Sequence, residues 1–156
     1  SKVLDYIDTE TDVTFITNNL LAISANVPSN VHIMITGGEL LPTHNALVGE
    51  FTVPSLRTVI ASKTFLGVNG ISAAGGLTTS TIQTVVVART MIECCNGPII
   101  VLADSSKIGK RLNFHFGDIE KVSYLVTDTK ADPEEIARIQ AAGVKVILVD
   151  PDTIFN

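Results

Sequence analysis

The sequence predicts an α/β domain with a mostly parallel sheet and helices on both faces. Short apolar runs rich in β-branched residues alternate with longer amphipathic stretches along the 156 residues, which is the order of consecutive βα units. Runs such as 99–102 and 144–149 are almost continuously apolar, as in strands that are covered on both sides. We therefore expect parallel strands joined by helical crossovers.

The expected strands are short runs of Val, Ile, Leu and Phe between turn residues. They fall at 14–17, 31–36, 63–68, 98–103, 122–127 and 144–149. The last crossover has the clearest helix signals. Asp132 is placed as an N-cap, Pro133 as the first helical residue and Glu135 as the partner in a capping box, while Gly143 ends the helix. This pattern predicts a helix over 132–142.

A second helix is expected at 81–95. Its three consecutive valines, Val85 to Val87, are poor helix formers, so packing must hold them in place. No internal repeat, low-complexity tract or linker divides the chain. The sequence therefore predicts one domain over 1–156.

Composition excludes several functional classes. With 46% hydrophobic and 17% charged residues, the chain is expected to fold around a core rather than remain disordered. Its 16 acidic and 11 basic residues give a net charge of −5, which repels nucleic-acid phosphates. No apolar run is long enough for a membrane span, and the first twenty residues carry acids where a signal peptide has bases. We expect a cytoplasmic protein without a membrane partner.

The two cysteines are sequence neighbours, Cys94 and Cys95, and so cannot join distant segments. No spacing of histidines, cysteines or carboxylates is typical of a metal site, and neither nucleotide-binding glycine motif is present. We therefore expect no metal and no cofactor.

Polar residues and glycines gather after the predicted strands, where an open α/β sheet binds ligands. They occupy the loops at 17–19, 37–38, 67–79, 104–107 and 127–128. Paired glycines allow backbone N–H groups to approach an anion, the hydroxyls of Thr78 and Thr79 are donors, and Lys107 supplies a positive charge. The combination is suited to a phosphorylated small molecule.

Each feature also has a purely structural interpretation. The glycine pairs are common turn residues, and Asp104 can cap the turn that follows it. Lys107 lies near Lys110 and Arg111 and can belong to a solvated basic cluster. A shared position at one edge of the sheet is what favours a binding site.

Seven motifs follow one another along the chain: Phe15-Ile16-Thr17-Asn18-Asn19, Met34-Ile35-Thr36-Gly37-Gly38-Glu39-Leu40, Ala46-Leu47-Val48-Gly49, Phe65-Leu66-Gly67-Val68-Asn69-Gly70-Ile71, Gly75-Gly76-Leu77-Thr78-Thr79, Arg89-Thr90-Met91-Ile92 and Leu102-Ala103-Asp104-Ser105-Ser106-Lys107-Ile108-Gly109. In this order they resemble the C-terminal effector-sensing domain of DeoR-type bacterial transcriptional regulators. The resemblance implies a fold similar to ribose-5-phosphate isomerases, glucosamine-6-phosphate deaminases and CoA transferases. It also implies a homo-oligomeric regulator, with a tendency toward repression of carbohydrate catabolism, whose winged helix-turn-helix domain precedes this segment and is absent from it.

The resemblance further implies a bound phosphorylated sugar or related metabolite. We expect Lys107 to bind its phosphate, Asp104 its hydroxyl groups, and the loop containing Gly76, Thr78 and Thr79 to provide donors. The remaining expected wall residues are Asn18, Gly38, Asn69 and Gly70.

The chain departs from the family pattern at several places. The Asp-Ser-Gly-Thr-Thr-like loop of the family should lie before this chain begins, and Leu41 and Ala88 stand where the family often has basic residues. Asn69 and Gln83 stand where it has acids.

A sugar-phosphate isomerase or deaminase of the same fold is the alternative function. Such an enzyme needs a carboxylate as general base, and the amides of Asn69 and Gln83 cannot accept a proton. We therefore expect a sensor rather than an enzyme. A pure oligomerisation module is the third possibility.

Overall fold

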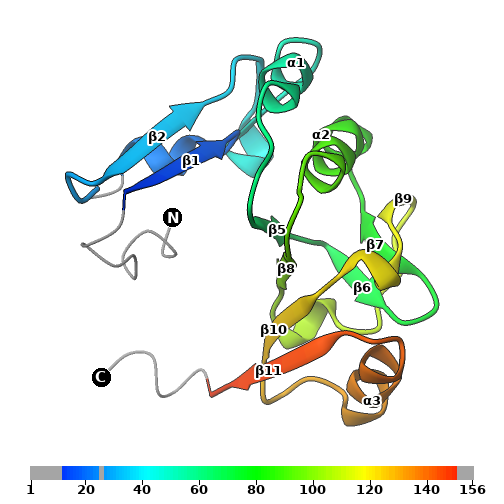
Figure 1. Cartoon of the computed structure of the whole chain (residues 1–156). Helices are drawn as coiled ribbons and strands as arrows, with labels where there is room; N and C mark the ends of the chain where they lie inside the picture. The colour runs from blue at the N-terminus through cyan, green and yellow to red at the C-terminus, as the bar shows by residue number, and fades with distance from the viewer. Residues whose placement is uncertain (1–11, 25–26, 151–156) are drawn as a thin grey trace. The chain divides into compact units, whose positions relative to one another are not determined.

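The computed structural model describes residues 12–24 and 27–150, which belong to two compact units. The N-terminal unit comprises residues 1–59 and the C-terminal unit residues 60–156. Figure 1 shows the chain coloured from its N-terminus to its C-terminus. Each unit has its own sheets, so each is described by itself.

The N-terminal unit contains two pairs of strands and short helices. Strand β1 (Val13–Thr17) pairs in parallel with β2 (Val31–Ile35), and β3 (Glu39–Leu41) pairs in antiparallel fashion with β4 (Ala46–Val48). The described residues of this unit also form the 3-10 helices η2 (Leu20–Ser24) and η3 (Pro42–His44) and the α-helix α1 (Thr52–Arg57).

The C-terminal unit is built on a four-stranded parallel sheet in the order β11-β10-β8-β5. Its strands are β5 (Thr64–Gly67), β8 (Ile99–Leu102), β10 (Tyr124–Asp128) and β11 (Lys145–Val149). All six predicted strands are therefore present as β1, β2, β5, β8, β10 and β11, and every pairing among them is parallel. The predicted α/β class with a mostly parallel sheet is confirmed.

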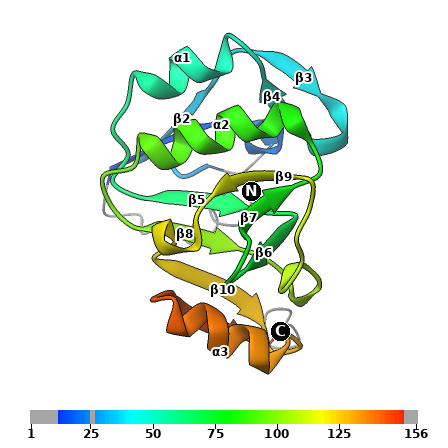
Figure 2. The ribbon, with the colours of Figure 1, turned by 90° about the vertical axis from the view of Figure 1, so that its right-hand side faces the viewer.

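A second sheet in this unit was not predicted. Strands β6 (Gly70–Ser72), β7 (Gly76–Thr79) and β9 (Phe114–Gly117) form an antiparallel sheet in that order (Figure 2). The prediction of one continuous loop over 67–79 is wrong for seven of its residues, all of which are buried in β6 and β7. These strands are rich in glycine, serine and threonine, so they lack the aliphatic pattern that identifies the other strands.

Two longer helices complete the C-terminal unit. Helix α2 (Ile82–Glu93) buries Val85 and Val87, and helix α3 (Pro133–Ala141) follows the predicted N-cap Asp132, which accepts a hydrogen bond from Glu134 N at 3.0 Å. The predicted capping box is wrong. The carboxylate of Glu135 instead accepts hydrogen bonds from Ala73 N and Arg138 Nε, both at 2.8 Å.

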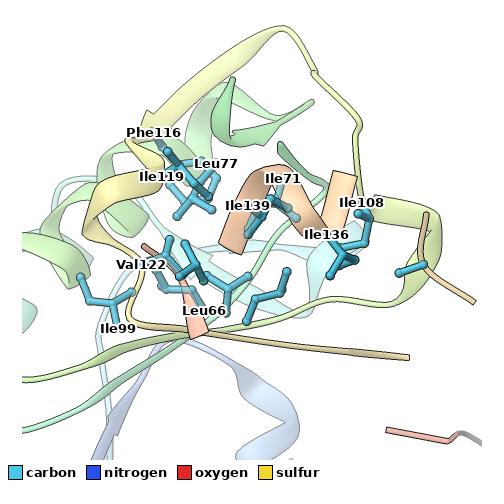
Figure 3. Close-up of a cluster of buried hydrophobic side chains, with 14 of the residues drawn as sticks. Leu66, Ile71, Leu77, Ile99, Ile108, Phe116, Ile119, Val122, Ile136 and Ile139 are labelled. Atoms are coloured by element: carbon cyan, nitrogen blue, oxygen red, sulfur yellow. The ribbon is translucent and has the colours of Figure 1, made fainter. Parts of the chain in front are cut away.

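The core of this unit lies between the parallel sheet and the elements packed on one of its faces. Leu66, Val101 and Leu125 share a sheet face by register and belong to one buried cluster with residues of both helices (Figure 3). Helices α2 and α3 lie on the same side of the sheet (Figure 1), as right-handed crossovers that step in one direction along it require. Short 3-10 helices, η4 (Ser105–Lys107) and η5 (Ile119–Lys121), follow β8 and β9.

Candidate functional site

The loops after β5, β8 and β10 leave the same edge of the parallel sheet. Strand β8 pairs in parallel with both β5 and β10, so the carboxyl ends of the three strands are neighbours. This edge is where open parallel sheets bind ligands. The predicted residues Asn69, Asp104 and Lys107 follow two of these strands.

Asn69 and Thr79 meet at the base of the β6–β7 hairpin. The hydroxyl of Thr79 donates to Asn69 Oδ1 at 2.8 Å and accepts from Thr81 N at 3.2 Å. Thr79 Oγ1 also lies 3.3 Å from Thr84 Oγ1. This network connects the end of β5 to the start of α2, and it brings together two residues that are distant in sequence.

Gly70 and Thr78 are paired across the same hairpin. Thr78 Oγ1 donates to Gly70 O at 3.2 Å and accepts from Leu112 N at 3.1 Å, and its side chain is buried. A Cβ atom at Gly70 would lie 2.6 Å from the carbonyl oxygen of Lys110. The two predicted residues are therefore used by the fold to hold the segment after η4 against β6.

Asp104 is the N-cap of η4. Its Oδ1 atom accepts from Ser106 N at 2.9 Å and also accepts from the Ser106 hydroxyl. The hydrogen bond from that hydroxyl, aided by Ser106 N and the positive charge of Lys107, lowers the pKa of Asp104 below its ordinary value. Asp104 thus caps the turn that follows it, as its structural interpretation predicted. Both hydrogen bonds from Ser106 are accepted by Oδ1.

Lys107 is the last residue of η4 and is half-buried. Its backbone N–H donates to Asp104 O at 2.9 Å, while its ammonium forms no ion pair within the described part of the chain. Two residues further on, Gly109 N donates to Ile71 O at 2.8 Å and ties this loop to β6. A fixed backbone therefore holds a cation that interacts with Asp104 through its charge but forms no close ion pair in the described part of the chain.

Asp128 ends strand β10 beside this loop. Its Oδ2 atom accepts from Ser105 N at 2.6 Å and its Oδ1 atom accepts from Lys130 N at 2.9 Å. The bond from Ser105 N is the main cause that lowers the pKa of Asp128 below its ordinary value. Sequence reasoning placed Asp128 in a polar loop but not among the site residues. An acidic residue directly after a buried strand was the available signal.

The neighbouring Thr127 has a buried hydroxyl, and its residue is 2% exposed. No partner for Thr127 Oγ1 occurs among the described residues. A buried hydroxyl without a hydrogen bond is unfavourable by about 1–3 kcal/mol. This hydroxyl lies at the carboxyl end of β10, on the same strand face as the core residue Leu125.

Gly76 lies at the other end of β7 from Thr79, beside a separate hollow of about 490 Å³. The hollow is bounded by the turn before β7 and the segment 111–120, and Thr78 also lines it, whereas Asp104 and Lys107 do not. The side chain of Arg111 lies across Gly75, where a Cβ atom would be 2.6 Å from Arg111 Nε. The predicted residues of this unit therefore do not all face one cavity.

Asn18 and Gly38 belong to the N-terminal unit, where both have structural partners. Asn18 Nδ2 donates to Leu47 O at 2.9 Å. Gly38 has a φ of +139°, and a Cβ atom there would lie 2.1 Å from Thr52 Oγ1. Thr52 Oγ1 in turn donates to Gly37 O at 2.7 Å, so the glycine pair and α1 are packed together.

A metal centre is not found in the described ranges, which contain no group of three or more histidine, cysteine or acidic side chains arranged to hold an ion. Over the same ranges, no helix has the length and apolar character needed to cross a bilayer.

The chain is an α/β domain with fixed polar loops at the carboxyl edge of a parallel sheet, which is where proteins of this class bind ligands. The particular family follows from comparison with known proteins. Residues 1–129 match the model of the DeoR C terminal sensor domain, and the chain belongs to that family. It is a sensor domain rather than an enzyme.

The similar curated proteins are transcriptional regulators. The chain is 33% identical over 139 residues to the uncharacterized HTH-type transcriptional regulator YulB of Bacillus subtilis, covering 88% of this chain and 54% of that protein. It is 31% identical over 127 residues to the HTH-type transcriptional regulator GlpR of Haloferax volcanii, covering 81% and 49%. It is 28% identical over 142 residues to the HTH-type transcriptional repressor GlcR of Bacillus subtilis, covering 90% and 54%. The chain spans about half the length of these relatives.

Proposed function

We propose that this chain is the part of a transcriptional regulator that binds a phosphorylated sugar or related metabolite at the carboxyl edge of the four-stranded sheet. Membership in a sensor-domain family supports the sensing role. The observation that favours an anionic ligand is Lys107, a half-buried cation without an ion pair in the described structure, fixed in a loop at that edge. Lysine ammonium groups are common phosphate ligands.

The surroundings of Lys107 are suited to the rest of such a ligand. Asp104 is held ionised by its hydrogen bonds, and its Oδ2 atom remains available to accept from a sugar hydroxyl. We place Asn69 and Gly70 in the adjoining wall at the end of β5, where Thr79 and Thr78 of β7 hydrogen-bond to them, whereas Gly76 lies at the far end of β7.

In the intact regulator, we propose that this domain acts on a helix-turn-helix DNA-binding domain outside the present chain. The names of the relatives support such a domain. The regulator would act as a cytoplasmic homo-oligomer, in which the ligand favours one arrangement of the DNA-binding domains. A ligand changes this balance only through its difference in affinity for the two states. Reversing a 99:1 preference takes about 5.5 kcal/mol.

A thermal-shift screen tests the proposal. Ribose 5-phosphate, glucose 6-phosphate and glucosamine 6-phosphate are compared with their unphosphorylated parents and with inorganic phosphate. A compound that binds the native state raises the melting temperature, by an amount that grows with concentration. We expect at least one sugar phosphate to do so while its parent does not. The absence of any shift across a wide panel of phosphorylated sugars would contradict the proposal.

A further inference from the structure

We propose that Asp128 is the positioning residue that holds the 104–107 loop in the conformation in which Lys107 meets an anion. This inference rests on the proposed function for its ligand, although the contact itself is independent of any ligand. Asp128 ends β10, and Ser105, which donates its N–H to Asp128 Oδ2 at 2.6 Å, follows the neighbouring strand β8. One carboxylate thus connects the two loops.

The geometry requires a carboxylate at this position. Asp128 uses both oxygens as acceptors, Oδ2 for Ser105 N and Oδ1 for Lys130 N. An asparagine has one acceptor oxygen and one NH₂ donor, so it can satisfy only one of these two N–H groups and turns a donor toward the other. The change removes little volume, and it alters these hydrogen bonds together with the charge of the side chain.

The capping carboxylate of Asp132 is the matched control in the same unit. It accepts from Glu134 N through Oδ1 alone, at 3.0 Å. An asparagine at Asp132 therefore keeps the acceptor that its turn needs. Asp132 caps α3, which is not part of the proposed binding edge.

The conformation of the loop shows what the Asp128 contact controls. Asp104 is extended, with φ −74° and ψ 161°, and the chain then enters the tight turn of η4, where Lys107 N bonds to Asp104 O. Ser105 is the first residue of that turn, so its N–H has no partner within the turn. Asp128 supplies the missing acceptor and fixes the point at which η4 begins.

The first experiment compares Asp128→Asn with Asp132→Asn in the 156-residue chain. NMR follows the amide proton of Ser105, which is shifted downfield by a short bond to a carboxylate. We expect Asp128→Asn to move this resonance upfield and to weaken sugar-phosphate binding by about tenfold, equivalent to ~1.4 kcal/mol. Asp132→Asn is expected to leave both measurements unchanged.

A second variant removes the donor rather than the acceptor. Proline is tolerated at the first position of a helical turn, and Asp104 already has the extended conformation that a residue before proline adopts. Ser105→Pro therefore deletes the N–H while keeping the carbonyl that Ile108 N uses. Ser105→Ala keeps the N–H and loses the hydroxyl, which also lowers the pKa of Asp128, so it separates the contribution of the hydroxyl from that of the N–H.

We expect Ser105→Pro to weaken binding as much as Asp128→Asn, and the double variant to be no weaker than either single one, since the two changes remove the same contact. The positioning role would be overturned if the losses of binding free energy of the two single variants added up in the double variant. It would also be overturned if Asp128→Asn changed neither the affinity nor the Ser105 resonance. If the unsubstituted chain binds no sugar phosphate, the proposed function fails. The Ser105 resonance then still decides whether Asp128 fixes the loop.

Discussion

The buried carboxylate of Glu135 accepts a hydrogen bond from the backbone N–H of Ala73 at 2.8 Å, which joins helix α3 to the turn of the β6–β7 hairpin. Its second oxygen accepts from Arg138 Nε, also at 2.8 Å. One side chain therefore serves two elements that are far apart in the sequence.

Replacing Glu135 by alanine should destabilise the C-terminal unit. The half-buried N–H of Ala73 would lose its acceptor, which is unfavourable by about 1–3 kcal/mol for a fully buried group and by less here. Glu134→Ala is the control, because both residues lie in the first turn of α3 but the Glu134 side chain is 82% exposed and its oxygen is 3.9 Å from Arg138. Its effect should stay within about 0.5 kcal/mol. Urea unfolding measures both, and equal losses would contradict the role of Glu135.

Two adjacent valines of α2 test the core. Val85 is 4% exposed and belongs to the buried cluster, whereas Val86 is 55% exposed. Valine-to-alanine substitution removes the same two methyl groups at both sites. We expect Val85→Ala to lower the free energy of unfolding by about 2 kcal/mol. Val86→Ala should be neutral or slightly stabilising, since alanine favours the helix. The difference in urea midpoint between the two variants is the measurement.

Gly76 should tolerate no side chain. Its φ is +62°, and a Cβ atom would lie 2.3 Å from the carbonyl oxygen of Gly117 in the neighbouring strand. Gly143 also has a positive φ, +98°, but a Cβ atom there meets nothing within 4 Å. Gly143→Ala should cost about 1–2 kcal/mol from backbone strain alone. Gly76→Ala should cost roughly 1–3 kcal/mol more because it also overpacks the sheet. Thermal melts compare the melting temperatures of the two variants. A smaller decrease for Gly76→Ala than for Gly143→Ala would contradict the close approach of Gly76 to Gly117 O.

Lys107→Ala should weaken binding of a phosphorylated ligand by about tenfold or more, equivalent to ~1.4 kcal/mol. The unphosphorylated parent should be affected much less. Lys110→Ala is the matched control, since Lys110 lies in the same segment, is exposed and does not belong to η4. Isothermal titration of the four combinations measures the effect. Equal losses for the phosphate and its parent would assign Lys107 a structural role.

Acid should destabilise the C-terminal unit through Asp104 and Asp128. Hydrogen bonds lower the pKa of both carboxyl groups in the folded state, from Ser106 for Asp104 and from Ser105 N for Asp128. The unfolded state therefore binds protons at a higher pH than the folded state does. The stabilisation is fully present above about pH 4, the ordinary pKa of aspartate, and is lost as the pH falls through the lower folded values. Urea midpoints at about pH 6 and about pH 3 should show the loss. Asp128→Asn should reduce this dependence on pH.

The parallel strands and the final helix were predictable because their signals are local. Apolar runs rich in β-branched residues identify strands β8 and β11, and the Asp132-Pro133 pair marks the start of α3. Strands β6 and β7 escaped prediction because each has a single aliphatic residue, Ile71 and Leu77, and because β9, which pairs with β7, lies about 40 residues further along the chain.

The site was predictable in its position more than in its contacts. Strand periodicity identifies the carboxyl edge of the sheet and hence Lys107. The bond between Asp128 and Ser105 depends on the register of β8 against β10, which no short sequence window contains. Likewise, the spacing of Glu135 from Asp132 fits a capping box. Only the fold shows that the Glu135 carboxylate instead accepts a hydrogen bond from Ala73 N.

The family match ends at residue 129, but the buried cluster continues through Ile136, Ile139 and Val144. A polypeptide that stopped at residue 129 would leave Leu125 and Ile71 without their cover and the amide of Ala73 without its acceptor. Domain boundaries for recombinant expression should therefore follow the hydrophobic packing and extend beyond β11, since the shorter fragment is expected to aggregate.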